Sequence, residues 1–369
     1  MQIKNGLTFV DKGFVPADVS FDKKITAVGK DLAPDGESFD ATGCYVIPGF
    51  VDIHTHGAMG EDFSDGEASG LQPMADHYAR NGVTSFLGTT MTLSEDVLTK
   101  AMHTMRDFKR SGGAKLAGVN LEGPFLCAAK KGAQAECNLH KPDVAVFDRL
   151  NEASGGMVKL VTVACEEEGA MEFIRTVSKT CTVSLGHSVA DYETAMRGFE
   201  AGATHATHLF NGMPSLLHRA PGIIGAAFDT GASVELICDG LHIHPSVVRV
   251  TQQLFGERLN LISDSLRCTG MPDGEYIFGG QPIELKNKKA TLKGTDTLAG
   301  STISVVDAVR NLVCFGAPLE AAIYAASTAP AKAVGFTDIG SIETGKCADL
   351  VVLDRALNIR AVFVDGERV

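Results

Sequence analysis

Two histidines separated by one residue are the first place in this chain where chemistry can be expected. His54 and His56 lie in the apolar run FVDIHTH, residues 50–56. Side chains at positions i and i+2 of a β-strand point to the same face, so both imidazoles can reach one metal ion. The pair alone leaves two interpretations open, a metal site and two hydrogen-bonded strand residues.

Four more ionisable residues stand at the ends of similar runs: Glu122 in LAGVNLEG (116–123), His187 in TVSLGHS (182–188), His208 in HATHLFN (205–211) and Asp264 in LNLISDS (259–265). Taken alone, each residue can have a purely structural role, because a carboxylate can cap the next segment. A lone histidine more often forms structural hydrogen bonds than it binds a metal. Together, imidazole and carboxylate groups suit Zn²⁺, and Fe²⁺ or Mn²⁺ less selectively.

The general acid/base candidate is Asp264. A carboxylate beside a metal-bound water can take its proton and later give it to a leaving amine. Asp239, in VELICDG (234–240), is the lesser rival for this role. His205 lies three residues before His208 and is expected to face the other side of its strand, in a structural role. His242 can reach the same edge, and Arg219, in a long Gly/Pro loop, can bind an anionic group bidentately.

Eight short apolar runs, most followed by a plausible helix, must position these residues. They span residues 50–56, 84–90, 116–123, 160–166, 182–188, 205–211, 234–240 and 259–265. Strand alternating with helix indicates a parallel sheet, and eight repeats favour a closed (β/α)8 barrel whose carboxyl strand ends meet at one mouth. A doubly wound open sheet is the alternative, although no GxGxxG follows the first run to favour a dinucleotide-binding version. Both ends of the chain instead read as short strands of one small β-rich domain.

The composition and charge of the chain limit the classes of partner that it can bind. The 369 residues carry 33 Lys+Arg against 45 Asp+Glu, a formal charge of −12, which argues against nonspecific binding to nucleic acid or anionic lipid. No run approaches the ~18 to 20 continuous apolar residues of a membrane span, and the N-terminal segment lacks the pattern of a signal peptide. The nine cysteines are scattered without a CxxC pair, which favours reduced thiols in a cytoplasmic protein.

Several segments together resemble the N-acetylglucosamine-6-phosphate deacetylases of the amidohydrolase superfamily. They are LEGPFLCAAKKGA, SLGHSVADYETAMRGFEAGATHATHLFNGMPSLLHRAPG, ICDGLHIHP and LAGST (298–302), with IPGFVDIHTHG before them and GKCADLVVLD near the end. An HxH pair is shared by many amidohydrolases, whereas LEGPF, GHS and THLFNGMP together are far more specific. The resemblance implies hydrolysis of the N-acetyl amide of N-acetylglucosamine-6-phosphate to glucosamine-6-phosphate and acetate.

It also implies a distorted (β/α)8 barrel that carries a small β-sandwich built from both termini. The expected boundaries are residues 1–47 for the N-terminal part of the sandwich and 48–275 for the barrel, with barrel-associated helices continuing to about 335. Residues 276–295 and 336–369 are expected to complete the sandwich.

Site residues carry over from the resemblance position by position. Glu122, His187 and His208 match the primary metal ligands, and Asp264 matches the general base and acid. The resemblance implies a homodimer or larger assembly in which a neighbouring subunit contributes to the phosphate site. Positions that match substrate contacts are Ala133, Asn211, Gly212, Leu298, Ala299 and Gly300, and those that match phosphate recognition are Arg219 and His242. Gln134, next to Ala133, is also expected to contact the substrate.

Two features vary among the members of this family. Some members lack the HxH pair and use one metal, so His54 and His56 allow a second; we expect one or two ions, Zn²⁺ first and Fe²⁺, Mn²⁺ or Co²⁺ as alternatives. Some members carry His where this chain has Gln134. Our hypothesis is that an ion at His54 and His56 takes over polarisation of the acetyl carbonyl from that missing histidine.

Two other functions stay open. One is a different amidohydrolase reaction on an anionic small molecule, by another amino-sugar deacetylase, a deaminase or a cyclic amidase. Arg219 with His242 favours a phosphorylated substrate over these. The other is a metal-free binding scaffold, against which the presence of Glu122, His187, His208 and Asp264 argues.

Overall fold

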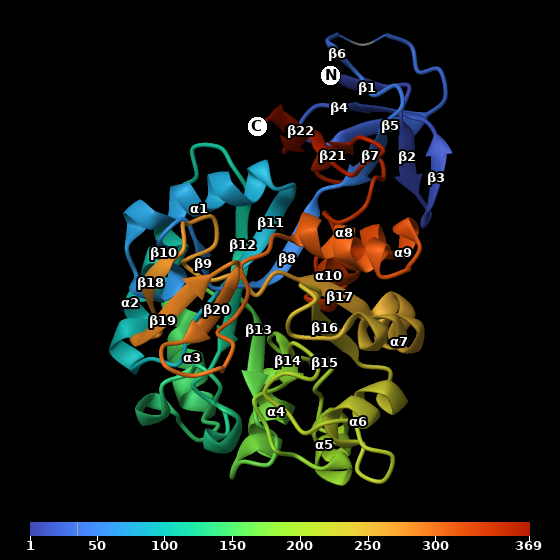
Figure 1. Ribbon diagram of the computed structural model, residues 1–369. Coiled ribbons are helices and arrows are strands. Elements are labelled where there is room, and N and C mark those ends of the chain that lie inside the picture. The colour runs from blue at the N-terminus through green and yellow to red at the C-terminus, as the bar shows by residue number, and fades with distance from the viewer. Residues whose placement is uncertain (35) are drawn as a thin grey trace.

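The computed structural model describes residues 1–34 and 36–369 (Figure 1). Its central sheet has eight parallel strands in chain order: β8 (Phe50–Thr55), β11 (Val83–Thr89), β12 (Lys115–Glu122), β13 (Val158–Val163), β14 (Thr182–Leu185), β15 (His205–Ala206), β16 (Ser233–Ile237) and β17 (Leu259–Ile262). The sheet closes where Thr55 bridges Ser265, just beyond β17. The predicted (β/α)8 barrel is confirmed, and the open-sheet alternative is wrong.

Helices cover the outside of the barrel because each carries one apolar face. In α2, for example, the buried residues Leu98, Ala101, Met102 and Met105 recur at helical spacing. The helices are α1 (Ala68–Arg80), α2 (Glu95–Asp107), α3 (Val144–Ala153), α4 (Ala170–Val177), α5 (Tyr192–Glu200), α6 (Gly222–Thr230), α7 (Pro245–Phe255), α8 (Val305–Cys314), α9 (Leu319–Ala326) and α10 (Thr328–Ala333). Short 3-10 helices are η1 (Phe63–Asp65), η2 (Ala128–Lys130), η3 (Glu136–Asn138) and η4 (Gly256–Arg258), and β9 (Gly57–Ala58) pairs with β10 (Glu61–Asp62).

Two further sheets are built from the ends of the chain, the first from N-terminal strands and the second from strands of both ends. One has the order β5 (Ile25–Gly29), β4 (Asp18–Phe21), β1 (Gln2–Lys4), β6 (Ser38–Asp40). The other has the order β23 (Glu367–Arg368), β22 (Ile359–Val364), β21 (Leu350–Leu353), β7 (Tyr45–Pro48), β2 (Leu7–Val10), β3 (Gly13–Pro16). Side chains of both sheets, including Phe21, Val46 and Phe363, share one apolar core. The expected small sandwich from both termini is thus present (Figure 1).

Residues 276–295 do not join that sandwich, and this part of the expected domain division is wrong. They fall in β18 (Gly274–Phe278), β19 (Gln281–Lys286) and β20 (Lys289–Leu292), which form a separate three-stranded sheet. Its apolar face packs on Met91, Leu266 and Ala299, near the carboxyl ends of the barrel strands. Figure 1 shows it beside β9 and β10, away from the terminal sheets. An alternating pattern predicts a strand, but it does not say which sheet the strand joins.

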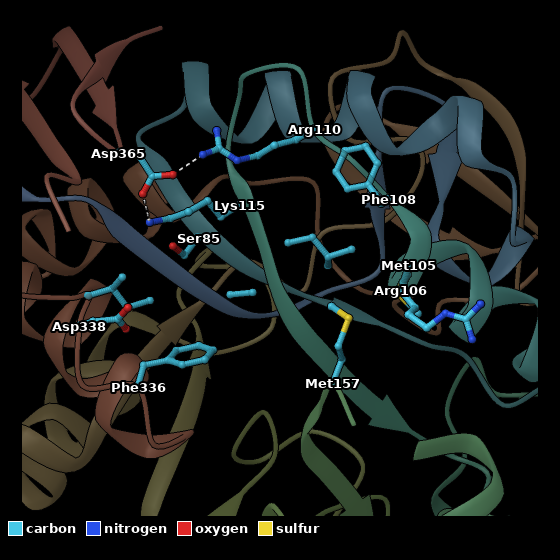
Figure 2. A pocket seen from close by; sticks show the side chains of 13 residues that line it. Ser85, Met105, Arg106, Phe108, Arg110, Lys115, Met157, Phe336, Asp338 and Asp365 are labelled. Carbon is cyan, nitrogen blue, oxygen red and sulfur yellow. Dashed lines mark hydrogen bonds and ion pairs between the residues drawn. The ribbon is translucent and has the colours of Figure 1, made fainter. Parts of the chain in front are cut away.

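An ion-pair cluster joins the terminal sheets to the amino end of the barrel (Figure 2). The ammonium of Lys115, at the start of β12, lies 2.7 Å from a carboxylate oxygen of Asp349 and 2.8 Å from one of Asp365. Arg110 also pairs with Asp365. The Asp349 side chain is only 2% exposed, so its charge depends on Lys115 for compensation. A cavity of about 450 Å³ lies beside this cluster, at the end of the barrel opposite the mouth.

Within the described residues, none of the helices combines the length and the apolar character that a bilayer crossing requires.

Candidate metal centre and active site

The six ionisable residues predicted at strand ends converge at the mouth of the barrel. One carboxylate oxygen of Glu122 lies 2.9 Å from Nε2 of His208, 3.1 Å from Nε2 of His187 and 3.4 Å from Nε2 of His54. Its other oxygen lies 3.2 Å from Nε2 of His56. Asp264 Oδ1 lies 3.4 Å from Nε2 of His56 and 3.5 Å from Nε2 of His54. All six side chains belong to buried residues.

Three of these residues have backbone conformations that side chains with a Cβ rarely adopt. The φ angles are 46° at His187, 24° at His208 and 47° at Asp264. Each such conformation costs on the order of 1–3 kcal/mol and persists only where the surroundings impose it. The three residues lie two positions beyond the ends of β14, β15 and β17, so the chain turns there and directs each side chain into the mouth.

The donor set fits a divalent cation. Three imidazole nitrogens face one oxygen of Glu122, and Nε2 of His54 is buried without a hydrogen-bond partner among the described residues. An orphaned buried nitrogen is costly unless something satisfies it. The ligand atoms of His54, His56 and Asp264 lie within 4.8 Å of one another, as do those of His54, Glu122 and His208. Imidazole and carboxylate ligands at this spacing are typical of zinc and related metals.

The electrostatics of the cluster also favour a bound cation. Burial opposes a charge on His56, yet its contacts with Asp264 and Glu122 raise its pKa to about 9. Burial likewise opposes the Glu122 carboxylate, but the adjacent His54 and His187 hold its pKa well below the ordinary range. The imidazoles and carboxylates thus favour each other's charged forms, and a cation would take the place of the imidazole protons.

Neighbouring groups orient the cluster. His187 donates from Nδ1 to the carbonyl of Lys130 at 2.7 Å, which turns its Nε2 toward Glu122. Gln134 donates from its amide nitrogen to Glu122 at 2.7 Å, and its amide oxygen accepts the backbone N–H of Thr92. Gln134 therefore supports the carboxylate of Glu122 directly.

A cavity of about 520 Å³ opens above the cluster. Seven of the positions expected to contact substrate line it: Ala133, Gln134, Asn211, Gly212, His242, Leu298 and Gly300. Ala299 does not, because it is fully buried under the β18–β20 sheet. Arg219 does not either; it is exposed in the loop before α6, with a guanidinium nitrogen 2.7 Å from His218. Within one chain, Ala299 and Arg219 therefore do not line this cavity, and their contacts with substrate stay predictions.

Asp239 serves His242 and not the cluster. Its carboxylate accepts the backbone N–H groups of Leu241 and His242, and lies 2.7 Å from Nδ1 of His242. This contact holds one imidazole nitrogen and leaves Nε2 available to the cavity. The lesser acid/base candidate is thus a partner of a cavity-lining histidine.

Sequence reasoning missed three residues of this region. Lys130 lines the cavity from η2, and Phe278 lines it from β18 with its ring 5.2 Å from that of His56. Glu235 lies behind His54 on β16, fully buried. Only Glu235 carried a usable signal, because an acidic residue inside the apolar run VELI is costly without partners.

Comparisons with known proteins agree with this geometry. The model of the amidohydrolase family matches residues 45–369. N-acetylglucosamine-6-phosphate deacetylase of Bacillus subtilis (strain 168) is 35% identical over 361 residues, covering 95% of this chain and 89% of that protein. N-acetylgalactosamine-6-phosphate deacetylase of Escherichia coli O157:H7 is 36% identical over 328 residues, covering 87% of each.

A solved structure extends the likeness to the whole fold. It is a variant of N-acetyl-D-glucosamine-6-phosphate deacetylase from Mycobacterium smegmatis in complex with N-acetyl-D-glucosamine-6-phosphate. It matches this chain with a TM-score of 0.93 and 31% identity, covering 100% of this chain and 98% of that one. The likeness therefore includes the terminal sheets as well as the barrel.

Proposed function

Because this chain belongs to the amidohydrolase family, we propose that it hydrolyses the N-acetyl amide of N-acetylglucosamine-6-phosphate to glucosamine-6-phosphate and acetate. The observation that carries the proposal is the buried cluster of four histidines and two carboxylates at the floor of a cavity. The deacetylases to which the chain is similar give the substrate class.

Glu122, His187 and His208 would hold a primary divalent cation, with Zn²⁺ as our first choice. His54 and His56 would hold a second, beside Asp264. A cation bound there would lower the pKa of coordinated water toward about 7 and polarise the acetyl carbonyl.

Asp264 is the proposed general base and acid. Burial alone would raise the pKa of its carboxyl, but the contact with His56 holds that pKa below its ordinary value, so Asp264 is ready to accept a proton. It takes one from the attacking water as the new C–O bond forms. It then returns that proton to the amine nitrogen as the C–N bond breaks, which releases acetate and the amino sugar.

Substrate binding is proposed to use the walls of the cavity. Asn211, Gly212 and Ala133 would contact the sugar and its acetyl group, and His242 would bind the phosphate. Because the phosphate is remote from the amide, these contacts supply binding energy and orientation.

We further propose that Arg219 completes the phosphate site of a second copy of the chain. Exposed apolar side chains lie on the loop that carries Arg219, which follows β15, and on the loops that follow the neighbouring strands β14 and β16. They are Val189, Leu216, Leu217 and Leu241. Such a patch supports an interface at the mouth.

A cytoplasmic location is also proposed, and the nine free cysteines support it.

The test compares acetate release from N-acetylglucosamine-6-phosphate, N-acetylgalactosamine-6-phosphate and unphosphorylated N-acetylglucosamine at equal concentrations, with Zn²⁺-loaded protein. We expect strong turnover of the first and little of the third. The similarity to the galactosamine enzyme makes the second sugar the informative competitor. Acetate release from none of them would overturn the proposed reaction.

A further inference from the structure

Glu235 is a buried acidic residue that the proposed mechanism does not use. It lies in the middle of β16, with an exposed fraction of 0%. One carboxylate oxygen, Oε2, is 2.9 Å from Nδ1 of His54 and accepts the backbone N–H of His208, also at 2.9 Å. The other oxygen, Oε1, is 3.3 Å from Nε2 of His205. A single side chain on β16 thus contacts residues of β8, of β15 and of the segment just beyond β15.

The contact with His54 determines which of its nitrogens carries the proton. An ionised carboxylate only accepts hydrogen bonds, so the nitrogen that faces it must carry a hydrogen. In a neutral ring, Nε2 then presents a lone pair. That nitrogen lies 3.4 Å from Glu122 and 3.5 Å from Asp264 and has no hydrogen-bond partner among the described residues.

The carboxylate cannot easily turn away from this position. The constraint is the backbone N–H of His208, which donates to Oε2 at a residue whose φ is 24°. Nε2 of His205 lies 3.3 Å from the second oxygen, but neither of these two atoms has a hydrogen-bond partner among the described residues. The group is therefore fixed from the side opposite the cluster.

We propose that Glu235 is a positioning residue that fixes His54 in the Nδ1–H form and so presents Nε2 to a divalent cation. This rests on the proposed function only in assuming that the cluster binds a cation. Carboxylates behind ligating histidines serve this purpose, and their loss typically weakens metal binding about 10–100-fold. The structural alternative is a carboxylate that only holds strands together.

The first experiment measures Zn²⁺ dissociation constants by competition with a chelator, starting from metal-free protein. In Glu235→Met we expect the ion at His54 to bind about 10–100-fold more weakly. Glu235→Gln should largely restore binding, because its amide oxygen can still accept from His54 while its NH2 group faces His205. His205→Met is the matched control, since it removes a buried contact of the same carboxylate and leaves the His54 contact in place. It should lower thermal stability but leave Zn²⁺ binding unchanged.

The second readout is the tautomer itself, from ¹H–¹⁵N correlations of histidine-labelled, Zn²⁺-loaded protein, with His54 assigned by its loss in His54→Gln. We expect the proton on Nδ1 in the unmodified chain. A proton on Nε2 would overturn the proposal, whether or not any variant folds. Equal weakening of Zn²⁺ binding by His205→Met and Glu235→Met would also overturn it, in favour of the strand-holding role. A chain that binds Zn²⁺ with the expected tautomer but releases no acetate would instead refute the proposed reaction alone.

Discussion

At the scale of single residues, the site depends on side chains that are held from behind. Lys130 orients His187 through its carbonyl, Gln134 supports Glu122, and Asp239 fixes His242. Each supporting contact leaves one ligating or binding atom directed at the cavity. Substituting a supporting residue should therefore change the orientation of a site atom without removing that atom.

The first prediction concerns proton transfer. Asp264→Asn replaces a carboxylate with an amide that cannot accept a proton, so we expect turnover of N-acetylglucosamine-6-phosphate to fall about 10²–10⁴-fold. The primary cation should stay bound, because Glu122, His187 and His208 are unchanged. On the same sample, acetate release measures turnover and elemental analysis measures the bound cation. Turnover near that of the unmodified chain would remove Asp264 from its proposed role.

The second prediction concerns phosphate recognition. Asp239→Asn replaces the carboxylate that holds Nδ1 of His242, so we expect KM for the phosphorylated sugar to rise about tenfold with kcat almost unchanged. Deacetylation of the unphosphorylated sugar should not change. Asp296→Asn is the control, because it removes a carboxylate that lines the same cavity but is exposed. A drop in kcat instead of a rise in KM would place Asp239 in the chemical step.

At the scale of elements, the β18–β20 sheet and the terminal sheets have different tasks. The first covers the mouth, where Phe278 packs against His56. The second is joined to the opposite end of the barrel by the ion pairs of Lys115. Stability and catalysis therefore reside at different ends of the same strands, as is common for this barrel.

This separation gives the third prediction. Lys115→Met leaves the buried charge of Asp349 without its partner, and we expect the free energy of unfolding to fall by about 3–5 kcal/mol. Lys293→Met, which removes an exposed pair with Glu275, should cost less than about 1 kcal/mol. Urea denaturation measures both, and catalytic rates of the folded variants should stay unchanged. Equal losses in the two variants would show that Asp349 does not need Lys115.

At the scale of the whole molecule, the proposed phosphate site would be incomplete in a single chain. Arg219 is exposed outside the cavity, in a loop that also exposes Leu216 and Leu217. An isologous dimer would place equivalent loops of two chains in reciprocal positions. The cavity of each chain could then receive Arg219 of the other.

The fourth prediction tests that arrangement by mixing two inactive variants. Arg219→Ala and Asp264→Asn should each have low activity alone at subsaturating phosphorylated substrate. After co-refolding, mixed dimers contain one site with both groups intact, so we expect activity to recover to about a quarter of the unmodified level. No recovery, with mixed dimers demonstrated by mass spectrometry, would place Arg219 in its own chain's site or outside any site.

Local sequence patterns are sufficient to predict the barrel and the cluster at its mouth. Strand–helix alternation is a local pattern, and parallel connections oblige all carboxyl strand ends to meet on one side. His54, Glu122, His187, His208 and Asp264 could therefore be grouped from their positions at the ends of apolar runs. Their joint presence, and not any one of them, indicated a metal site.

Contacts between distant segments fix the features that local patterns do not encode. Residues 276–295 alternate like a strand of the terminal sandwich, yet they pair with one another because their apolar face meets Met91 and Leu266 at the mouth. Asp239 faces His242, and Glu235 faces His54 across 181 positions of sequence. Which sheet a strand joins, and which ring a buried carboxylate meets, depend on contacts between distant segments, and those contacts form only when the chain closes its barrel.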